Sequence, residues 1–116
     1  NWLIITKDLN DEEKKLLNDN NIKYIGNKLD NTNNCFEDSI EVIKHVSGVI
    51  STDTSLVHLS ANLNIKTFVL LTTGAEWRWT KDEKTNWYPN SILIRQKEHG
   101  KWDYVIEELI KKLNYV

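Results

Sequence analysis

Residues 48–63, GVISTDTSLVHLSANL, decide the fold of this chain. A short apolar run predicts the end of a buried strand, and residues 51–55 then form a polar turn. Leu56, Leu59 and Leu63 recur at the spacing of an amphipathic helix. The stretch therefore predicts a strand, a turn and the start of a helix, which is the place where α/β sheets usually present a ligand site.

Four polar residues of this stretch form a candidate phosphate site: Asp53, Thr54, Ser55 and His58. Asp53 or Thr52 can cap the helix, which places Thr54 and Ser55 in its first turn. Backbone N–H groups there lack partners within the helix, and the helix dipole favours an anion. His58 lies one turn further along and can face the same group. An ordinary capped helix with a half-buried histidine explains the same residues, but the position at the carboxyl end of a strand favours a ligand site.

Strands and helices alternate along the rest of the chain. Apolar runs predict strands at residues 2–6, 23–26, 48–52, 67–71 and 91–96. Apolar periodicity predicts helices at about residues 11–18, 36–46, 54–63 and 102–113. Asn10 and Glu13 predict a capping box at the first helix, and Asn34 a cap at the second. Asn64 can end the third helix.

This alternation predicts an α/β fold, a Rossmann-like parallel sheet of about five strands with helices on both faces and right-handed crossovers. A chain of 116 residues holds one core, so residues 1–116 are expected to form a single domain. The chain contains no methionine and opens on a strand-like run at residues 2–5, which indicates a piece of a longer protein.

Residues 72–90 form a connection too long for a plain loop, and it carries three of the five tryptophans. Trp77 and Arg78 are candidate contacts for a sugar or base, with an aromatic ring to stack on and a guanidinium to reach a phosphate. The other interpretation is a small buried aromatic cluster, which we favour for Trp79 and Trp87. An ion pair of Arg78 with a neighbouring acid, Glu76 or Asp82, is equally compatible with the sequence.

Composition excludes several classes of function. The formal net charge of −2 gives no general attraction to nucleic acid or to an anionic membrane. No apolar run approaches the roughly 20 residues of a membrane span, and no signal-peptide pattern is present, so we expect a cytoplasmic protein. The single cysteine rules out an internal disulfide, and the three histidines show no metal-binding spacing with it. We therefore expect no metal.

Four motifs, taken in order, resemble a known family: VISTDTSLVHLSANLNIKTFVLL, GAEWRW, NWYPNSILIRQ and GKWDYVIEEL. Together they are similar to the C-terminal half of glycosyltransferase family 9, the heptosyltransferase-like proteins. The likeness is to the bacterial branch that carries N-terminal tetratricopeptide repeats. It is strong over about residues 46–109 and fainter over residues 2–34.

The resemblance implies a GT-B glycosyltransferase, in which two Rossmann-like domains close on a nucleotide-sugar and the C-terminal domain holds the donor. The family's D-[ST]-G-x-x-H turn binds the donor diphosphate and maps onto Asp53, Thr54, Ser55 and His58. Transfer in the family needs no metal and no cofactor. Ser55 departs from the family's usual glycine.

The resemblance also implies that parts of the enzyme are absent from this sequence. The family's C-terminal domain starts with a further strand and a basic loop, and the N-terminal domain supplies the acceptor site and the catalytic base. The chain is therefore expected to bind a nucleotide-sugar and to be inactive without that domain. The alternative is a non-catalytic protein-interaction module that has kept the fold.

Overall fold

The computed structural model describes residues 1–33 and 35–114, so Asn34, expected as a helix cap, lies outside the described residues. The described chain separates into two compact units, Asn1–Val42 and Ile43–Val116. Among the described helices, none is long and apolar enough to cross a lipid bilayer.

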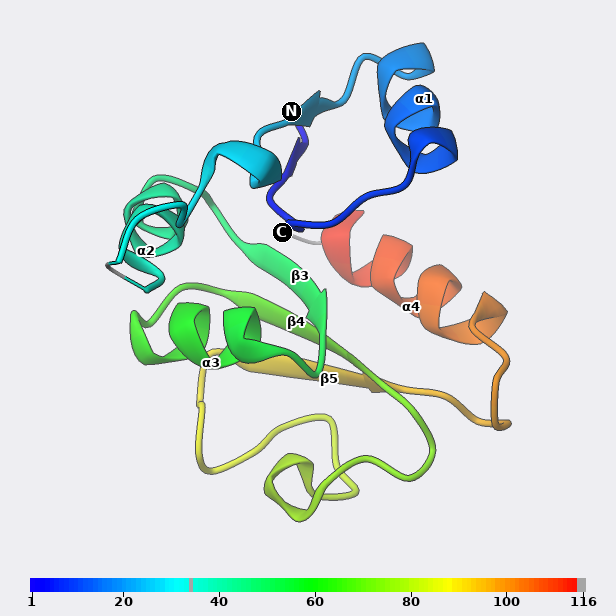
Figure 1. The fold of residues 1–116 in the computed structure, drawn as a ribbon. Coiled ribbons are helices and arrows are strands. Elements are labelled where there is room, and N and C mark those ends of the chain that lie inside the picture. Colours follow the sequence, from blue (N-terminus) through cyan, green and yellow to red (C-terminus); the bar gives the residue numbers. More distant parts are fainter. Residues whose placement is uncertain (34, 115–116) are drawn as a thin grey trace. The chain divides into compact units, whose positions relative to one another are not determined.

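The first unit contains a short helix beside a two-stranded sheet (Figure 1). Its elements are β1 (Leu3–Ile4), α1 (Asp11–Asp19), β2 (Lys23–Tyr24), the 3-10 turn η1 (Gly26–Lys28) and the start of α2 (Glu37–Lys44). Strands β1 and β2 are parallel, with Leu3 opposite Lys23. Just beyond β2, Gly26 passes so close to β1 that a Cβ atom would lie 2.1 Å from the carbonyl oxygen of Thr6. Only glycine fits this approach.

The capping box predicted for α1 is confirmed. The Glu13 N–H donates to Asn10 Oδ1 at 2.8 Å, and the Asn10 N–H donates to Glu13 Oε2 at 2.9 Å. At the other end, Asn21 takes a left-handed conformation with φ of 54°. The N–H groups of Asn21 and Ile22 then bond to the carbonyls of Asn18 and Leu17, which closes the helix.

Helix α2 takes its N-terminal cap from a distant residue. The carboxylate of Asp30 accepts the N–H groups of Asp38 at 3.0 Å and of Ser39 at 3.3 Å. The Asp38 carboxylate accepts the Asp30 N–H in return, at 2.8 Å. The pair satisfies the first-turn donors in the way that a capping box does within one helix.

The second unit is a parallel sheet in the strand order β3-β4-β5. Its elements are β3 (Val49–Thr52), α3 (Ser55–Asn62), β4 (Thr67–Leu71), the 3-10 turn η2 (Trp77–Trp79), β5 (Ser91–Arg95) and α4 (Asp103–Asn114). The pairing places Val49 opposite Thr67, and Thr67 opposite Ser91. The carboxyl ends of the three strands therefore lie at one edge of this sheet.

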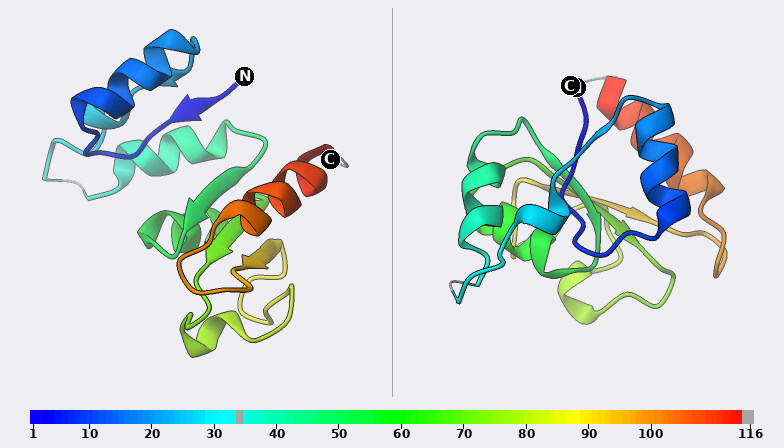
Figure 2. Two further views of the ribbon diagram at one scale, coloured as in Figure 1. Left: turned by 90° about the vertical axis from the view of Figure 1, so that its right-hand side faces the viewer. Right: turned by 45° about the horizontal axis from the view of Figure 1, so that its top comes forward.

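Helices cover both faces of the three-stranded sheet, as expected (Figures 1 and 2). Successive side chains of a strand point to opposite faces, so Val69 packs on the α3 side and Phe68 on the α4 side. The α3 side is a cluster of Val57, Val69, Leu71, Trp79 and Leu93. The α4 side is a cluster of Phe68, Ile94, Val105 and Leu109.

The sheet differs from the expected one in its connectivity. All five predicted strands form, but in the described residues hydrogen bonds join them into one pair and one triplet, not into a single sheet of about five. The strands of the first unit are only two residues long, so they offer few backbone groups for further pairing. The α/β class with parallel strands is confirmed.

Candidate functional site

The candidate turn joins the end of β3 to the start of α3. The capping residue is Thr54, with extended backbone angles (φ −132°, ψ 172°), so the prediction of Asp53 or Thr52 as the cap is wrong. The Thr54 side chain makes no capping hydrogen bond, because its hydroxyl lies 2.9 Å from the hydroxyl of Ser51. The N-cap residue Thr54 therefore leaves the first-turn N–H groups of α3 without a side-chain cap.

The open amides of this turn belong to Ser55 and Leu56. The Val57 N–H already donates to the Thr54 carbonyl at 3.2 Å. Ser55 and Leu56 precede it at the helix start and have no acceptor within the helix. Their N–H groups carry the positive end of the helix dipole, so an anion placed at this end of α3 is stabilised.

The structure brings Asp53 and His58 together. His58 Nε2 lies 3.7 Å from Asp53 Oδ1, and about a third of each side chain is exposed. On the other side of the ring, His58 Nδ1 lies 2.9 Å from the Tyr88 hydroxyl. Because 3.7 Å is too long for a hydrogen bond, the Nε2 atom remains able to donate to a third group. Asp53 itself carries only acceptors when ionised, so it cannot donate a hydrogen bond to an anion.

Aromatic rings hold His58 in this orientation. Its ring stacks on Trp79, with centroids 5.3 Å apart and planes 28° apart, and meets Tyr88 edge-on at 5.6 Å. Trp79 is completely buried in the α3-side cluster, as predicted. The long connection thus contributes two side chains that fix the histidine of the turn. The role of Tyr88 could not be anticipated, because 30 positions separate it from His58.

The prediction that Trp87 is buried is wrong. Trp87 is 57% exposed and Trp77 69% exposed, and their rings meet edge-on with centroids 5.5 Å apart. Of the three indoles in the connection, only that of Trp79 is buried in the core. The other two indoles therefore pack against each other at the surface.

Arg78 pairs with one of the two acids considered for it. Its Nη2 atom lies 2.6 Å from Glu76 Oε2, and its guanidinium lies over the Trp77 ring, 5.6 Å from the centroid. Both charged side chains are about one-third exposed. The pair fixes the Glu76 carboxylate beside Trp77, and Arg78 would have to leave Glu76 to reach a phosphate.

Arg95, at the end of β5, is a structural residue that sequence reasoning missed. Its guanidinium donates to the carbonyls of Trp79 at 3.1 Å and Thr72 at 3.4 Å, and also to that of Thr80. Thr80 has a positive φ of 40°, which is rare for a threonine. Arg95 therefore holds the connection over the carboxyl edge of the sheet. Every residue has a backbone carbonyl, so the sequence cannot show which carbonyls Arg95 binds, and its role in holding the connection could not be predicted.

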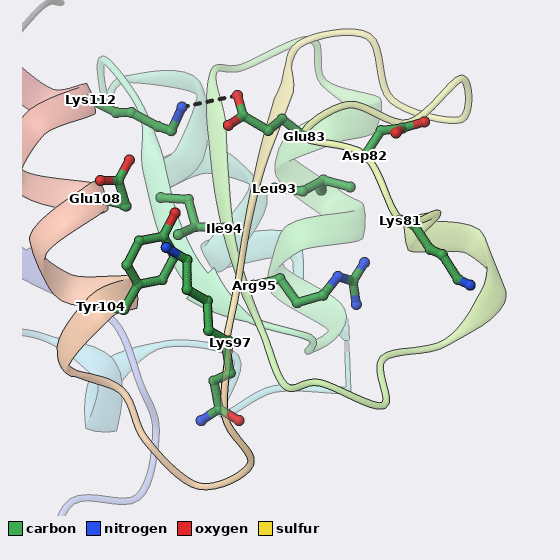
Figure 3. Close-up of a pocket in the computed structure, with 11 residues that line it drawn as sticks. Lys81, Asp82, Glu83, Leu93, Ile94, Arg95, Lys97, Tyr104, Glu108 and Lys112 are labelled. Atoms are coloured by element: carbon green, nitrogen blue, oxygen red, sulfur yellow. Dashed lines mark hydrogen bonds and ion pairs between the residues drawn. The ribbon is translucent and has the colours of Figure 1, made fainter.

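Two hollows lie near the ends of the second unit's strands. The larger, about 550 Å³, is lined by Thr73, Ala75, Glu76, Trp77, Thr80, Lys81 and Arg95. The smaller, about 240 Å³, lies between β5 and α4 (Figure 3). The four residues of the candidate diphosphate turn line neither hollow. In the described part of the chain, no group of three His, Cys, Asp or Glu residues could hold a metal ion.

The smaller hollow is lined by charged side chains of both signs. Lys112 Nζ lies 3.1 Å from Glu83 Oε2, and Lys97 Nζ lies 3.7 Å from the centroid of the Tyr104 ring (Figure 3). The Lys111 ammonium holds the pKa of Glu108 below its usual 4.5, chiefly through a hydrogen bond of 2.7 Å. The hollow has the character of a solvated charged surface.

Comparisons with protein-family models, with curated proteins and with solved structures gave no match for this chain.

Proposed function

We propose that this chain is the donor-binding part of a GT-B glycosyltransferase, and that the start of α3 binds the diphosphate of a nucleotide-sugar. The observation that carries this proposal is the uncapped N-terminus of α3 at the carboxyl end of β3. Thr54 is a good capping residue, yet its hydroxyl turns to Ser51 and leaves the first-turn amides to another acceptor. A diphosphate provides acceptors that carry the charge the helix dipole favours.

Each residue of the turn has its own role. The N–H groups of Ser55 and Leu56 donate to the phosphate oxygens, and the Ser55 hydroxyl lies beside them. His58 donates from Nε2, and the Asp53 carboxylate lies 3.7 Å from the same atom. Charge-assisted hydrogen bonds of this kind contribute about 1.5–3 kcal/mol each. These residues bind and orient the donor, and none of them is assigned a catalytic step.

Sugar transfer requires the second domain of the GT-B fold, which supplies the acceptor site and the base. We propose that this chain belongs to a longer bacterial, cytoplasmic protein with tetratricopeptide repeats. The chain by itself would bind donor without transferring sugar, and binding would need neither a metal nor a cofactor.

Titration of the 15N-labelled chain with UDP, GDP, ADP and pyrophosphate tests the proposal. We expect the amide signals of residues 52–60 to shift at millimolar ligand. In a Thr54→Asp variant the new carboxylate accepts the first-turn amides itself, so the shifts should vanish while the helix becomes more stable. Thr72→Asp is the matched control: it adds the same charge at the same sheet edge, after β4, and should keep the response.

Two results would contradict the proposal. One is an absence of shifts at residues 52–60 with every nucleotide and with pyrophosphate. The other is a Thr54→Asp variant that binds as well as the unmodified chain.

A second candidate function, a non-catalytic interaction module, is favoured by the exposed Trp77 and Trp87 pair. Exposed aromatic side chains are common in protein–protein interfaces. Replacing Asp53 and His58 by alanine in the full-length parent protein separates the two functions. Unchanged sugar transfer would contradict the donor site, whereas loss of partner binding would support the module.

A further inference from the structure

The larger hollow lies at the same edge of the sheet as the diphosphate turn. Thr73 follows the end of β4 by two residues, and Arg95 is the last residue of β5. The turn itself follows β3, the neighbour of β4. Ligands of open α/β sheets bind outside the carboxyl ends of the strands. The volume of about 550 Å³ is in the range of small-molecule sites.

Trp77 gives this hollow an aromatic surface held in a fixed orientation. The indole is 69% exposed, while the Trp87 ring packs against it in a T-shaped arrangement and the Arg78 guanidinium lies over its ring. The exposed part of the indole therefore remains for a ligand. A ring that stacks there removes apolar surface from water, and little side-chain freedom is lost because the indole is already braced.

The polar groups around Trp77 suit a sugar. Glu76 is held by Arg78 at 2.6 Å and presents carboxylate oxygens that can accept from sugar hydroxyls. Lys81 and Arg95 also line the hollow, and Arg95 donates to backbone carbonyls and forms no ion pair among the described residues. Positive charge at this edge favours a ligand that carries a neighbouring diphosphate.

From this arrangement we infer that the hollow is the subsite for the pyranose ring of the donor sugar, with Trp77 as its stacking surface and Glu76 as its hydroxyl acceptor. This inference rests on the proposed function, since the diphosphate at α3 brings the sugar to the hollow. Trp77 is then a specificity-determining residue for the donor sugar.

Fluorine NMR of the chain labelled with 5-fluorotryptophan tests the inference. The probes are three pairs of free nucleotide and nucleotide-sugar: UDP and UDP-glucose, GDP and GDP-mannose, ADP and ADP-glucose. We expect the Trp77 signal, assigned with a Trp77→Phe variant, to shift with at least one nucleotide-sugar and to stay fixed with its free nucleotide. Trp77→Ala should weaken that nucleotide-sugar about tenfold and leave its free nucleotide unchanged.

Trp87→Phe is the matched control, because Trp87 is exposed in the same connection but does not line the hollow. It should keep most of the affinity for the nucleotide-sugar. The inference is overturned if nucleotides shift the amides of residues 52–60 but no nucleotide-sugar shifts Trp77, and the donor site then still stands. It is also overturned if free nucleotide alone shifts Trp77, which would place the base in the hollow. If neither the turn nor Trp77 responds, the proposed function itself has failed.

Discussion

Replacing Trp79 by alanine should destabilise the second unit severely, because Trp79 is the largest of its fully buried side chains. A buried aromatic side chain removes about 150–250 Å² from water. At about 25 cal/mol per Å² this corresponds to about 4–6 kcal/mol, near the roughly 3–5 kcal/mol measured for tryptophan-to-alanine changes in cores. Whole-domain stabilities are about 5–15 kcal/mol, so the change removes a large part of the total. The matched change Trp77→Ala, two positions away and 69% exposed, should alter stability by no more than about 0.5 kcal/mol.

Urea denaturation followed by far-UV circular dichroism measures both variants. A Trp79→Phe variant adds a second comparison, because the indole Nε1 of Trp79 has no acceptor among the described residues. Phenylalanine removes this unpaired donor, so it should lose less stability than alanine does. Equal losses for Trp77→Ala and Trp79→Ala would refute the assignment of one indole to the core and one to the surface.

Three further predictions concern helix ends and surface charge. Asn10→Ala should lower the free energy of unfolding by about 1 kcal/mol, because it removes one half of the capping box, and an unchanged urea midpoint would contradict this. Asn21→Val should lose about 1–2 kcal/mol and Asn21→Gly should lose none, because φ is 54° there, and equal midpoints for the two variants would contradict this. Lys111→Met should raise the pKa of Glu108 toward 4.5, as read from its carboxyl 13C shift. Since folding lowers that pKa, the stabilisation from Glu108 is present above pH 4.5 and is lost as the pH falls through the pKa of Glu108 in the folded protein. An unchanged Glu108 titration in Lys111→Met would show that Lys111 does not lower this pKa.

Two helix ends, the start of α1 and the end of α3, were predictable from the sequence, because the residues that form them are close in sequence. The capping box of Asn10 spans three residues, and Asn64, proposed as a helix end, has a φ of 59° just beyond α3. Its N–H donates to the Ala61 carbonyl at 3.0 Å. The cap of α2 could not be found this way, because Asp30 lies eight positions from Asp38. The grouping of strands into two sheets likewise depends on pairings between distant segments.

The candidate site was predictable where it depends on helical spacing and unpredictable where it depends on the long connection. Asp53 and His58 come together as neighbours across the first turn of α3. Tyr88 and Trp79, which orient the histidine, come from a segment whose path the sequence pattern does not determine. For the same reason the sequence pattern does not distinguish Trp79 from Trp87. Which indole enters the core depends on how the connection turns, and hydrogen bonds from Arg95 to backbone carbonyls help to set that path.

The start of α3 differs from those of α1 and α2 in a way that bears on function. Asn10 caps α1, and the Asp30 carboxylate caps α2, whereas the Thr54 hydroxyl turns away from α3. Restoring a cap at position 54 would add about 1 kcal/mol of stability, and Thr54→Asp does so with a single side chain. Proteins retain such local losses mainly at sites where a ligand or a reaction uses the exposed group. A purely structural turn would gain stability from Thr54→Asp and lose nothing, whereas an anion site would gain the same stability and lose its ligand.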